Sequence, residues 1–398
     1  MSAVVNGQNP MPADHIMPGT SDRWTWMYDG VLFATFSHQT GLRGSDEIVS
    51  TDWVMGMASR RAGPGTLTLT GMASLERATT GARGYRELFQ VGETYHFVPI
   101  VDRQHPHDLL MQASVAWRLP LDANTGITFA AAPVGEPALG PVAFMHRASA
   151  AENSVAPLSH HTLDSTHISM GVISVGVDRG PWVFESSVFQ SGEPDDNRWD
   201  LIDFGPLDSW SARVSYRASG SWEFQGSHGY LKNPEWLEFA HVRRTTGSAS
   251  WFRRRTDGFT AATLAFGQNQ KEFHGTFRAA LGEITDRRGR VSLYGRAERV
   301  GVETELLRSR GIFHSHTQVA SDGVTAATVG VVIDVPRWKT LRRFEAGLGA
   351  EVTSYVVPSS LRTAYGNHPV AMRVFLRVRP PAGTMGRMWN MRMARATP

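Results

Sequence analysis

Histidine and carboxylate side chains are concentrated in two segments of the chain. The first, at residues 102–108, reads DRQHPHD, and the second lies between residues 133 and 167. Neutral imidazole is the commonest protein ligand for zinc and copper, and carboxylates complete such sites. The candidate ligands of a transition metal, copper or zinc, are therefore His105, His107, Asp108, His146, His160, His161, Asp164 and His167.

The spacing within these segments is compatible with a metal site but does not require one. His105 and His107 are two residues apart, so in an extended segment their side chains point the same way. The sequence has no HExxH motif and no cysteine. Two other interpretations stay open. The imidazoles can serve only as hydrogen-bonding groups of folded loops, or they can act in acid–base catalysis.

Serine residues beside these histidines suggest a hydrolase as a further alternative. Ser159 or Ser165 could pair with His160 or His167. Nucleophilic catalysis needs the hydroxyl within hydrogen-bond reach of the base, with a third group that orients the base. No nucleophile-elbow motif is present.

Composition limits the class of protein. Charged residues make up 19% of the 398 residues, below the roughly 25% typical of soluble domains. No window contains the ~20 apolar residues that a transmembrane helix needs, so only strands could span a bilayer. The net charge of +3 gives no reason to expect nucleic acid as a partner.

Apolar and polar residues alternate along many segments, which is typical of strands. In residues 370–379, for example, Met372, Val374 and Leu376 oppose Arg373 and Arg377. The polar face is rich in charge, as expected for the lumen of a barrel. The residues predicted to line that lumen are Arg213, Arg217, Glu223, Arg278, Arg296, Glu298, Glu345, Glu351, Arg373 and Arg377.

The pattern predicts about sixteen strands, within a range of about 14 to 18. Most are longer than the usual ~5–6 residues of globular strands and suit a tilted membrane span. They are expected at residues 23–38, 51–61, 65–76, 108–118, 125–136, 166–178, 181–192, 206–217, 220–231, 244–255, 258–269, 273–284, 289–301, 324–335, 340–356 and 367–379.

The connections alternate between short turns and long loops, and aromatic residues gather beside the short turns. Both features are typical of outer-membrane barrels. The aromatic residues are Trp24, Trp26, Trp117, Trp182, Tyr216, Trp222, Trp251, Phe259, Trp338 and Phe344. We therefore predict an all-β fold, a transmembrane antiparallel barrel over residues 23–380, with a flexible segment at 1–22 and a tail at 381–398.

Four motifs resemble a known family. They are DRQHPHD at 102–108, GPVAFMHR at 140–147, SHHTLDSTHI at 159–168 and FGPLDS at 204–209. They resemble a family of bacterial proteins of about this length that have no established activity and are predicted to be outer-membrane barrels. The resemblance covers most of the chain and implies a location in the outer membrane, in contact with its lipid, but no reaction. Residues 1–20 contain no apolar stretch typical of a signal peptide.

The functional expectation is a porin-like channel for small solutes or ions. Arginine outnumbers glutamate six to four among the predicted lumen residues, which suggests a weak preference for anions. The loops at 77–107 and 137–165 are expected to constrict or plug the pore. The alternatives are a metal-handling barrel and an outer-membrane hydrolase. The oligomeric state is left open.

Overall fold

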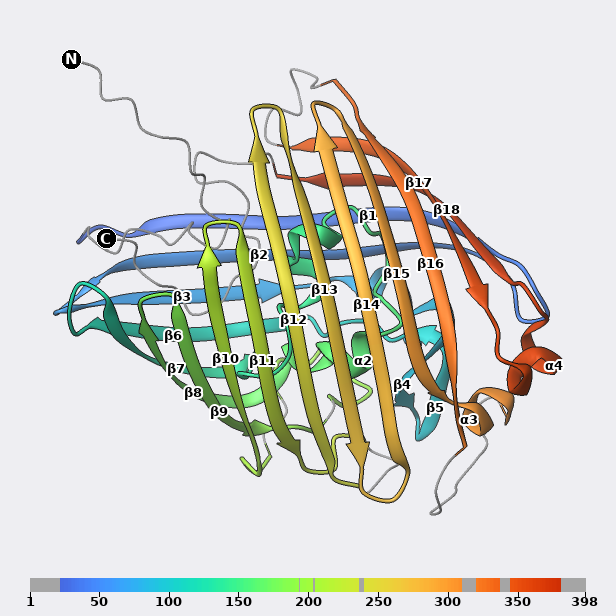
Figure 1. Cartoon of the computed structure of the whole chain (residues 1–398), viewed down its shortest axis with the longest axis horizontal. Helices are drawn as coiled ribbons and strands as arrows, with labels where there is room; N and C mark the ends of the chain where they lie inside the picture. The colour runs from blue at the N-terminus through green and yellow to red at the C-terminus, as the bar shows by residue number, and fades with distance from the viewer. Residues whose placement is uncertain are drawn as a thin grey trace.

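The computed structural model describes residues 22–192, 194–202, 205–235, 240–309, 320–336 and 344–380. Sixteen strands of this part form one closed antiparallel barrel, in which β1 (Thr25–Gln39) pairs with both β2 (Asp46–Ala62) and β18 (Val370–Arg379) (Figure 1). Closure leaves no unpaired sheet edge, as a sheet surrounded by lipid requires. The predicted fold class and strand number are confirmed. The predicted terminal segments lie outside the described residues, apart from residue 22.

The other barrel strands follow one another around the ring in nearly sequential order. They are β3 (Gly65–Ala73), β6 (Leu110–Pro120), β7 (Thr125–Gly135), β8 (Ser169–Arg179), β9 (Trp182–Gln190), β10 (Ser209–Ser219), β11 (Trp222–Leu231), β12 (Val242–Arg255), β13 (Gly258–Lys271), β14 (Gly275–Arg288), β15 (Val291–Glu303), β16 (Ser321–Asp334) and β17 (Glu345–Val356).

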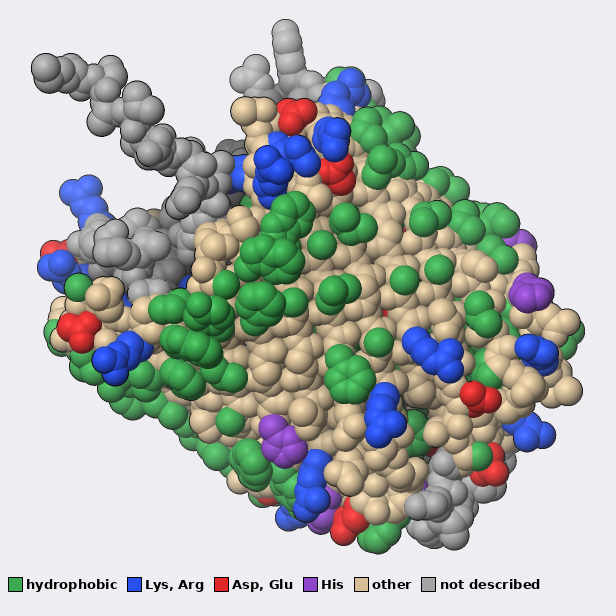
Figure 2. All heavy atoms as spheres, viewed as in Figure 1, with side chains coloured by type: hydrophobic (Ala, Val, Ile, Leu, Met, Phe, Trp, Pro, Cys, Tyr) green, Lys and Arg blue, Asp and Glu red, His purple; other side chains and the backbone are tan. Residues whose placement is uncertain are grey.

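The alternation of residue types places apolar side chains outside and polar side chains inside. Along β18, Arg373 and Arg377 are buried, whereas Val374 is 59% exposed on the outer surface. Figure 2 shows hydrophobic side chains across the middle of one outer face, with many of the charged side chains toward its margins. Such an apolar outer surface is stable in lipid and unfavourable in water.

Aromatic side chains at the short-turn end mostly follow the same rule. Trp26 is 72% exposed, and Trp182 and Trp222 also face outward. Phe259 is the exception, because it is buried inside the barrel against Phe252. The expectation that Phe259 belongs to the outer aromatic belt is therefore wrong. Trp338 lies outside the described residues.

Connections differ in length at the two ends of the barrel. At one end, turns of two residues join β2 to β3, β8 to β9, β10 to β11, β12 to β13 and β14 to β15. At the other end, the connections include residues 74–109, 136–168 and 191–208. Only the three residues 272–274, between β13 and β14, are comparably short at this end.

One strand pair was missed by the sequence analysis. β4 (Tyr85–Tyr95) and β5 (Val98–Gln104) form a separate two-stranded sheet within the connection that was expected to be a loop. Its register shifts twice, and Phe89 and Asp102 have positive φ values of 69° and 57°. Leu88 and Phe89 of β4 pack against Val300, Tyr355 and other inward-facing side chains, so this hairpin lies inside the barrel.

The described helices are short, and none is long and apolar enough to cross a membrane. They lie in the connections between strands. They are α1 (Glu76–Thr79), η2 (Phe144–His146), η3 (Ala148–Ala150), α2 (His160–Leu163), η4 (Ser165–His167), α3 (Thr304–Ser309), η6 (Ser359–Leu361) and α4 (Arg362–Tyr365). Figure 1 shows α2 within the barrel and α3 and α4 at one end of it.

The connection 136–168 reaches across the lumen. The His146 ring stacks edge-on against Trp53 of β2, with ring centroids 4.8 Å apart. The next residue, Arg147, forms an ion pair with Glu283 of β14 at 2.6 Å. Five strands, β1, β18, β17, β16 and β15, separate β2 from β14 in the ring order. Two consecutive residues therefore contact well-separated parts of the wall, and the loop fills the space between them.

Candidate functional site

Five of the predicted histidines form one cluster inside the barrel. Neighbouring ring centroids are 5.3 Å apart for His105 and His161, 5.2 Å for His161 and His160, and 5.2 Å for His160 and His167. His107 closes the circle at 5.4 Å from His167 and 6.4 Å from His105. We call these five residues the histidine cluster.

Three short elements position the cluster. His105 and His107 follow directly after β5, His160 and His161 begin α2, and His167 ends η4. The Phe144 ring packs against the cluster, with its centroid 5.2 Å from that of His160 and 6.5 Å from that of His107. The two motifs at 102–108 and 159–168 thus meet in space.

Hydrogen bonds at Nδ1 fix the orientation of three of these rings. Nδ1 of His167 lies 2.9 Å from the backbone carbonyl oxygen of Asp164, which can only accept a hydrogen bond. Nδ1 of His160 lies 2.6 Å from the Asp164 carboxylate, and Nδ1 of His107 lies 2.9 Å from Glu76. In the neutral ring each Nδ1 therefore carries the hydrogen, and the lone pair is on Nε2.

The Nε2 atoms on the other side of the rings have no such partners. Those of His107, His160, His161 and His167 are buried and make no hydrogen bond to any described residue. A buried polar atom without a partner costs about 1–3 kcal/mol. Several such atoms in one cluster therefore indicate a place for a ligand or for water.

His105 differs from the others. Its Nε2 lies 3.1 Å from Glu93, and its Nδ1 lies 3.3 Å from the carbonyl oxygen of Pro106. Both ring nitrogens thus face an oxygen atom, and a neutral ring can donate its single N–H to only one of them, so neither nitrogen of His105 is free of a neighbouring oxygen in this arrangement. Its predicted role as a metal ligand would require it to leave Glu93.

Burial keeps most of the cluster uncharged. Burial lowers the pKa of His105, His161 and His167 well below the usual value, and also lowers that of His160. His107 is the exception: burial acts to lower its pKa, but the Glu76 carboxylate beside it outweighs burial and raises it. Neutral imidazoles are the form that binds metal ions.

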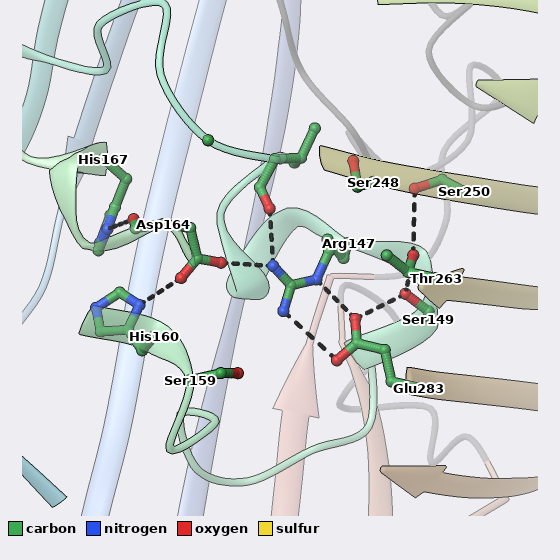
Figure 3. Close-up of polar contacts among 12 residues, drawn as sticks. Arg147, Ser149, Ser159, His160, Asp164, His167, Ser248, Ser250, Thr263 and Glu283 are labelled. Carbon is green, nitrogen blue, oxygen red and sulfur yellow. Dashed lines mark hydrogen bonds and ion pairs between the residues drawn. The ribbon is translucent and has the colours of Figure 1, made fainter. Parts of the chain in front are cut away.

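The carboxylate of Asp164 connects the histidine cluster to the barrel wall, and its oxygen atoms are already engaged in hydrogen bonds. It accepts hydrogen bonds from His160 and from Arg147, and Arg147 in turn contacts Glu283 of β14 (Figure 3). Burial alone would raise the pKa of Asp164, but the Arg147 guanidinium and His160 hold it well below its usual range. Carboxylates that orient metal-binding histidines in this way are common.

Asp108 and His146 stand apart from the cluster's centre. Asp108 forms an ion pair with Arg198 at 3.2 Å, and burial raises its pKa to about 6. His146 is packed on Trp53, and burial lowers its pKa to about 4. The His146 ring lies on Trp53 and is not one of the five rings of the histidine cluster, so its role as a metal ligand stays a prediction.

The cluster is wider than a formed metal site. Among the described residues, no three His, Asp or Glu side chains surround a common point at which they could hold a metal ion. Ligand nitrogens lie ~2.0–2.1 Å from zinc, so the rings would have to move inward. The metal ligands stay a prediction.

The predicted lumen residues mostly face inward, where some contact the loops and others pair with neighbouring strands. Arg373 contacts Glu87 of β4 at 2.6 Å and Glu351 of β17 at 3.2 Å. Glu298 accepts hydrogen bonds from the backbone of Leu158 and Ser159. The remaining inward-facing members of the set, all within 4 Å of an oppositely charged side chain, are Arg213, Arg217, Glu223, Arg296, Glu345 and Arg377.

Arg278 is a correction to the predicted lumen set. It is exposed on the outer face of β14, between the buried Phe277 and Ala279, and its Nε donates to Gln268 of β13 at 3.1 Å. Near the rim of a barrel an arginine can face outward, because its guanidinium reaches the polar interface.

The serine residues considered for a hydrolase are engaged elsewhere. The Ser159 hydroxyl donates to Glu298 at 2.9 Å, and the Ser165 hydroxyl accepts from Arg244 at 2.9 Å. These contacts do not assemble the serine–histidine pair that nucleophilic catalysis needs. Sequence reasoning missed Glu76, Arg147 and Glu283 as supports of the cluster, since nothing in their local sequence separates them from other charged residues.

Comparison with solved structures places the fold. The chain is similar to an anion-selective porin from Comamonas acidovorans, with a TM-score of 0.52, 9% identity, and coverage of 90% of this chain and 99% of that one. It is similar to OprB of Pseudomonas putida, with a TM-score of 0.50, 10% identity, and coverage of 90% and 94%. A loop-deletion mutant of OmpT, an outer-membrane protein of Vibrio cholerae, matches with a TM-score of 0.50, 12% identity, and coverage of 90% and 99%.

These structural matches cover 90% of the chain, but the sequence identity is only 9–12%. No protein-family model matches the sequence, and no curated protein matches it. The shared feature is the fold, a closed antiparallel barrel of the kind that bacterial outer-membrane proteins form.

Proposed function

We propose that the chain is a porin-like barrel of the bacterial outer membrane that passes small solutes or ions. The observation that carries the proposal is the closed sixteen-stranded ring, apolar outside and polar inside. Similarity to an anion-selective porin and to OprB supports it at the level of the fold. In this proposal lipid surrounds the outer face of the barrel, and solutes pass through the lumen.

Loops occupy part of the lumen of this barrel, and many of its described inward-facing charges are paired. The hairpin β4–β5 and the connection 136–168 lie within the lumen. Their carboxylates form ion pairs with Arg213, Arg373 and Arg377 of the wall. We therefore do not extend the proposal to the anion preference inferred from the excess of arginine. The proposed route is narrow, and its selectivity is set by the loops.

Two measurements test this proposal. The first is extraction: the folded protein should need detergent and should change its gel mobility on boiling. A chain that stays monomeric in plain buffer would overturn the membrane assignment. The second is conductance in planar bilayers, where we expect small, discrete current steps. A barrel that passes no current, even after its loops are loosened by substitution, would overturn the channel function.

A second function, binding of a transition metal such as copper or zinc, is favoured by one specific observation. Nε2 of His107, His160 and His167 is buried without a partner, while Nδ1 of each ring is held by a carboxylate or a carbonyl oxygen. That is the arrangement of a histidine prepared to bind metal through Nε2. His161 supplies a fourth unpartnered Nε2.

Calorimetric titration with Zn²⁺ and Cu²⁺ tests the second function. We expect wild-type protein to bind about one ion per chain, and His160→Ala and His167→Ala to lose that binding. His146→Ala is the matched control, because His146 is equally buried but lies against Trp53, outside the cluster. No binding to wild type, or unchanged binding in the cluster variants, would remove the idea.

A further inference from the structure

Six methionines, five on strands of the inner wall and one in the connection 136–168, gather at one place in the barrel. Met27 of β1, Met55 of β2, Met72 of β3 and Met111 of β6 are buried and packed together, with Met57 and Met145 against them. We call these six residues the methionine patch. All four fully buried members of this packing cluster are methionine.

The strand register brings the thioethers close to one another. Met27 lies directly opposite Met57, and Met55 lies directly opposite Met72. Side chains directly opposite in antiparallel strands have Cβ atoms about 4.5–5.5 Å apart. Met55 and Met57 are two residues apart on one strand, so both point into the lumen. The backbone itself therefore imposes the arrangement.

Ordinary core packing does not account for this composition. Methionine is a flexible filler that occurs in many cores, so a mixture with Leu, Ile and Val would be expected. The six other clusters of buried hydrophobic side chains among the described residues contain no methionine. The methionines of the barrel are thus concentrated at one place, although other inward-facing positions are equally apolar.

The patch adjoins the histidine cluster through two loop segments. Met145 belongs to the patch, and its neighbours along the chain are Phe144, which contacts His160, and His146, which lies on Trp53. Ile168, directly after His167, also packs against the patch. A ligand leaving one group of donors would meet the other without crossing the wall.

We propose that the methionine patch is a binding site for a soft monovalent metal ion of the Cu⁺ or Ag⁺ type. Thioether sulfur is a soft ligand that favours Cu⁺, whereas zinc prefers nitrogen, oxygen or thiolate. An uncharged donor set suits a monovalent ion better than a divalent one, because burying an isolated charge is costly. One carboxylate, that of the buried Asp29, lies directly opposite Met55 in the same row.

This site is distinct from the histidine cluster and does not depend on it. Passage of solutes through the barrel and zinc binding by the histidines are each independent of whether the patch binds a soft ion. The two groups differ in donor chemistry, so probes that discriminate between sulfur and nitrogen ligands separate the two proposals.

The test uses the full-length protein in detergent micelles. Ag⁺ affinity is measured by competition with a chromophoric chelator, and Cu⁺ affinity in the same way under a reductant. The Met55→Leu/Met72→Leu double variant keeps the side-chain volume, and such swaps in cores usually cost under about 1.5 kcal/mol. Met170→Leu is the control, since Met170 is equally buried on β8 but lies outside the patch.

We expect the double variant to bind Ag⁺ and Cu⁺ at least about tenfold more weakly than wild type, while Met170→Leu is unchanged. Zn²⁺ titration of the same variants should be unaffected, and His160→Ala should leave the patch site intact. Wild type that does not compete for Ag⁺, or a double variant that competes as well as wild type, would overturn the proposal. Ag⁺ binding that is lost in the double variant belongs to the patch, whereas binding by other methionines, such as Met388 near the C-terminus, would persist in the variant.

Discussion

Nδ1 of His160 lies 2.6 Å from the carboxylate of Asp164, and both side chains are almost completely buried. The same carboxylate accepts a hydrogen bond from Arg147, so one residue joins an imidazole of the histidine cluster to the barrel wall. The orientation of the histidine cluster therefore depends on charged residues outside it, Arg147 and Glu283.

Asp164→Asn should weaken metal binding without removing any proposed ligand. The substitution leaves Arg147 with one buried carboxylate partner fewer and weakens the hold on His160. Loss of such an orienting contact typically costs 10–100-fold in metal affinity. Calorimetric titration with Zn²⁺ measures it, and His160→Ala serves as the reference for complete loss. Equal affinity in Asp164→Asn and wild type would show that Asp164 has no positioning role.

Arg373→Met should loosen the β4–β5 hairpin. Arg373 lies between Glu87 and Glu351 and is itself buried, so its removal leaves two carboxylates without their cation. Breaking a buried pair in this way typically destabilises a protein by about 3–5 kcal/mol. We expect a lower midpoint of denaturant unfolding and larger current steps in planar bilayers.

The matched comparison for Arg373→Met is Glu87→Gln, which weakens the same link from the hairpin side. Glu87 also accepts a hydrogen bond from Tyr355 at 2.9 Å. Both variants should change conductance in the same direction. If both lower stability but leave the current unchanged, the hairpin does not control the route through the lumen.

Arg278→Ala should leave ion selectivity unchanged. Arg278 is exposed on the outer face, with its hydrogen bond to Gln268 also at the surface, and such contacts contribute about 0–1 kcal/mol. Reversal-potential measurements across a salt gradient compare it with wild type. A clear shift in selectivity would mean that the guanidinium reaches the solute path.

Stability at acid pH should depend on Glu152. Burial alone would raise its pKa, but Arg379 and Arg377 lower it from 4.5 to about 2. Since the pKa is lower in the folded state, ionised Glu152 stabilises the fold fully above about pH 4.5, and this contribution disappears as the pH falls to about 2. Denaturant unfolding between pH 7 and 2 measures it.

The control for this pH dependence is Glu152→Gln, which cannot ionise. The difference in unfolding free energy between wild type and Glu152→Gln should be largest above pH 5, of the order of 3 kcal/mol, and should vanish near pH 2. A constant difference across this range would show that Glu152 is not ionised in the folded protein.

The barrel strands could be predicted because one face of each strand is apolar and lies on the outside of the barrel, whereas the other is largely polar and faces the lumen. The expected strand at 367–379 contains β18 (Val370–Arg379), where Val and Leu alternate with Arg. β4 and β5 could not be predicted in the same way. They pair only with each other, with shifted register and a positive φ at Phe89, so no single alternating face marks them.

The candidate site was only partly predictable. The motifs identified the histidines, but His146 lies one residue from Arg147 and still faces the other part of the wall. Which histidines meet depends on how the loop crosses the lumen, and that is set by contacts with β14, β15 and β17 far along the chain. The methionine patch was not anticipated, because its members come from four strands and a loop.

The loop that crosses the lumen also constrains the order of assembly. Arg147 pairs with Glu283, which lies 136 residues further along the sequence, and Glu152 pairs with Arg377, which lies 225 residues further along. Closing such long segments of chain is entropically unfavourable until the strands between them are paired. We therefore expect these buried ion pairs to form only after the strands between their partners have paired, so that the interior of the barrel becomes native later than those strands.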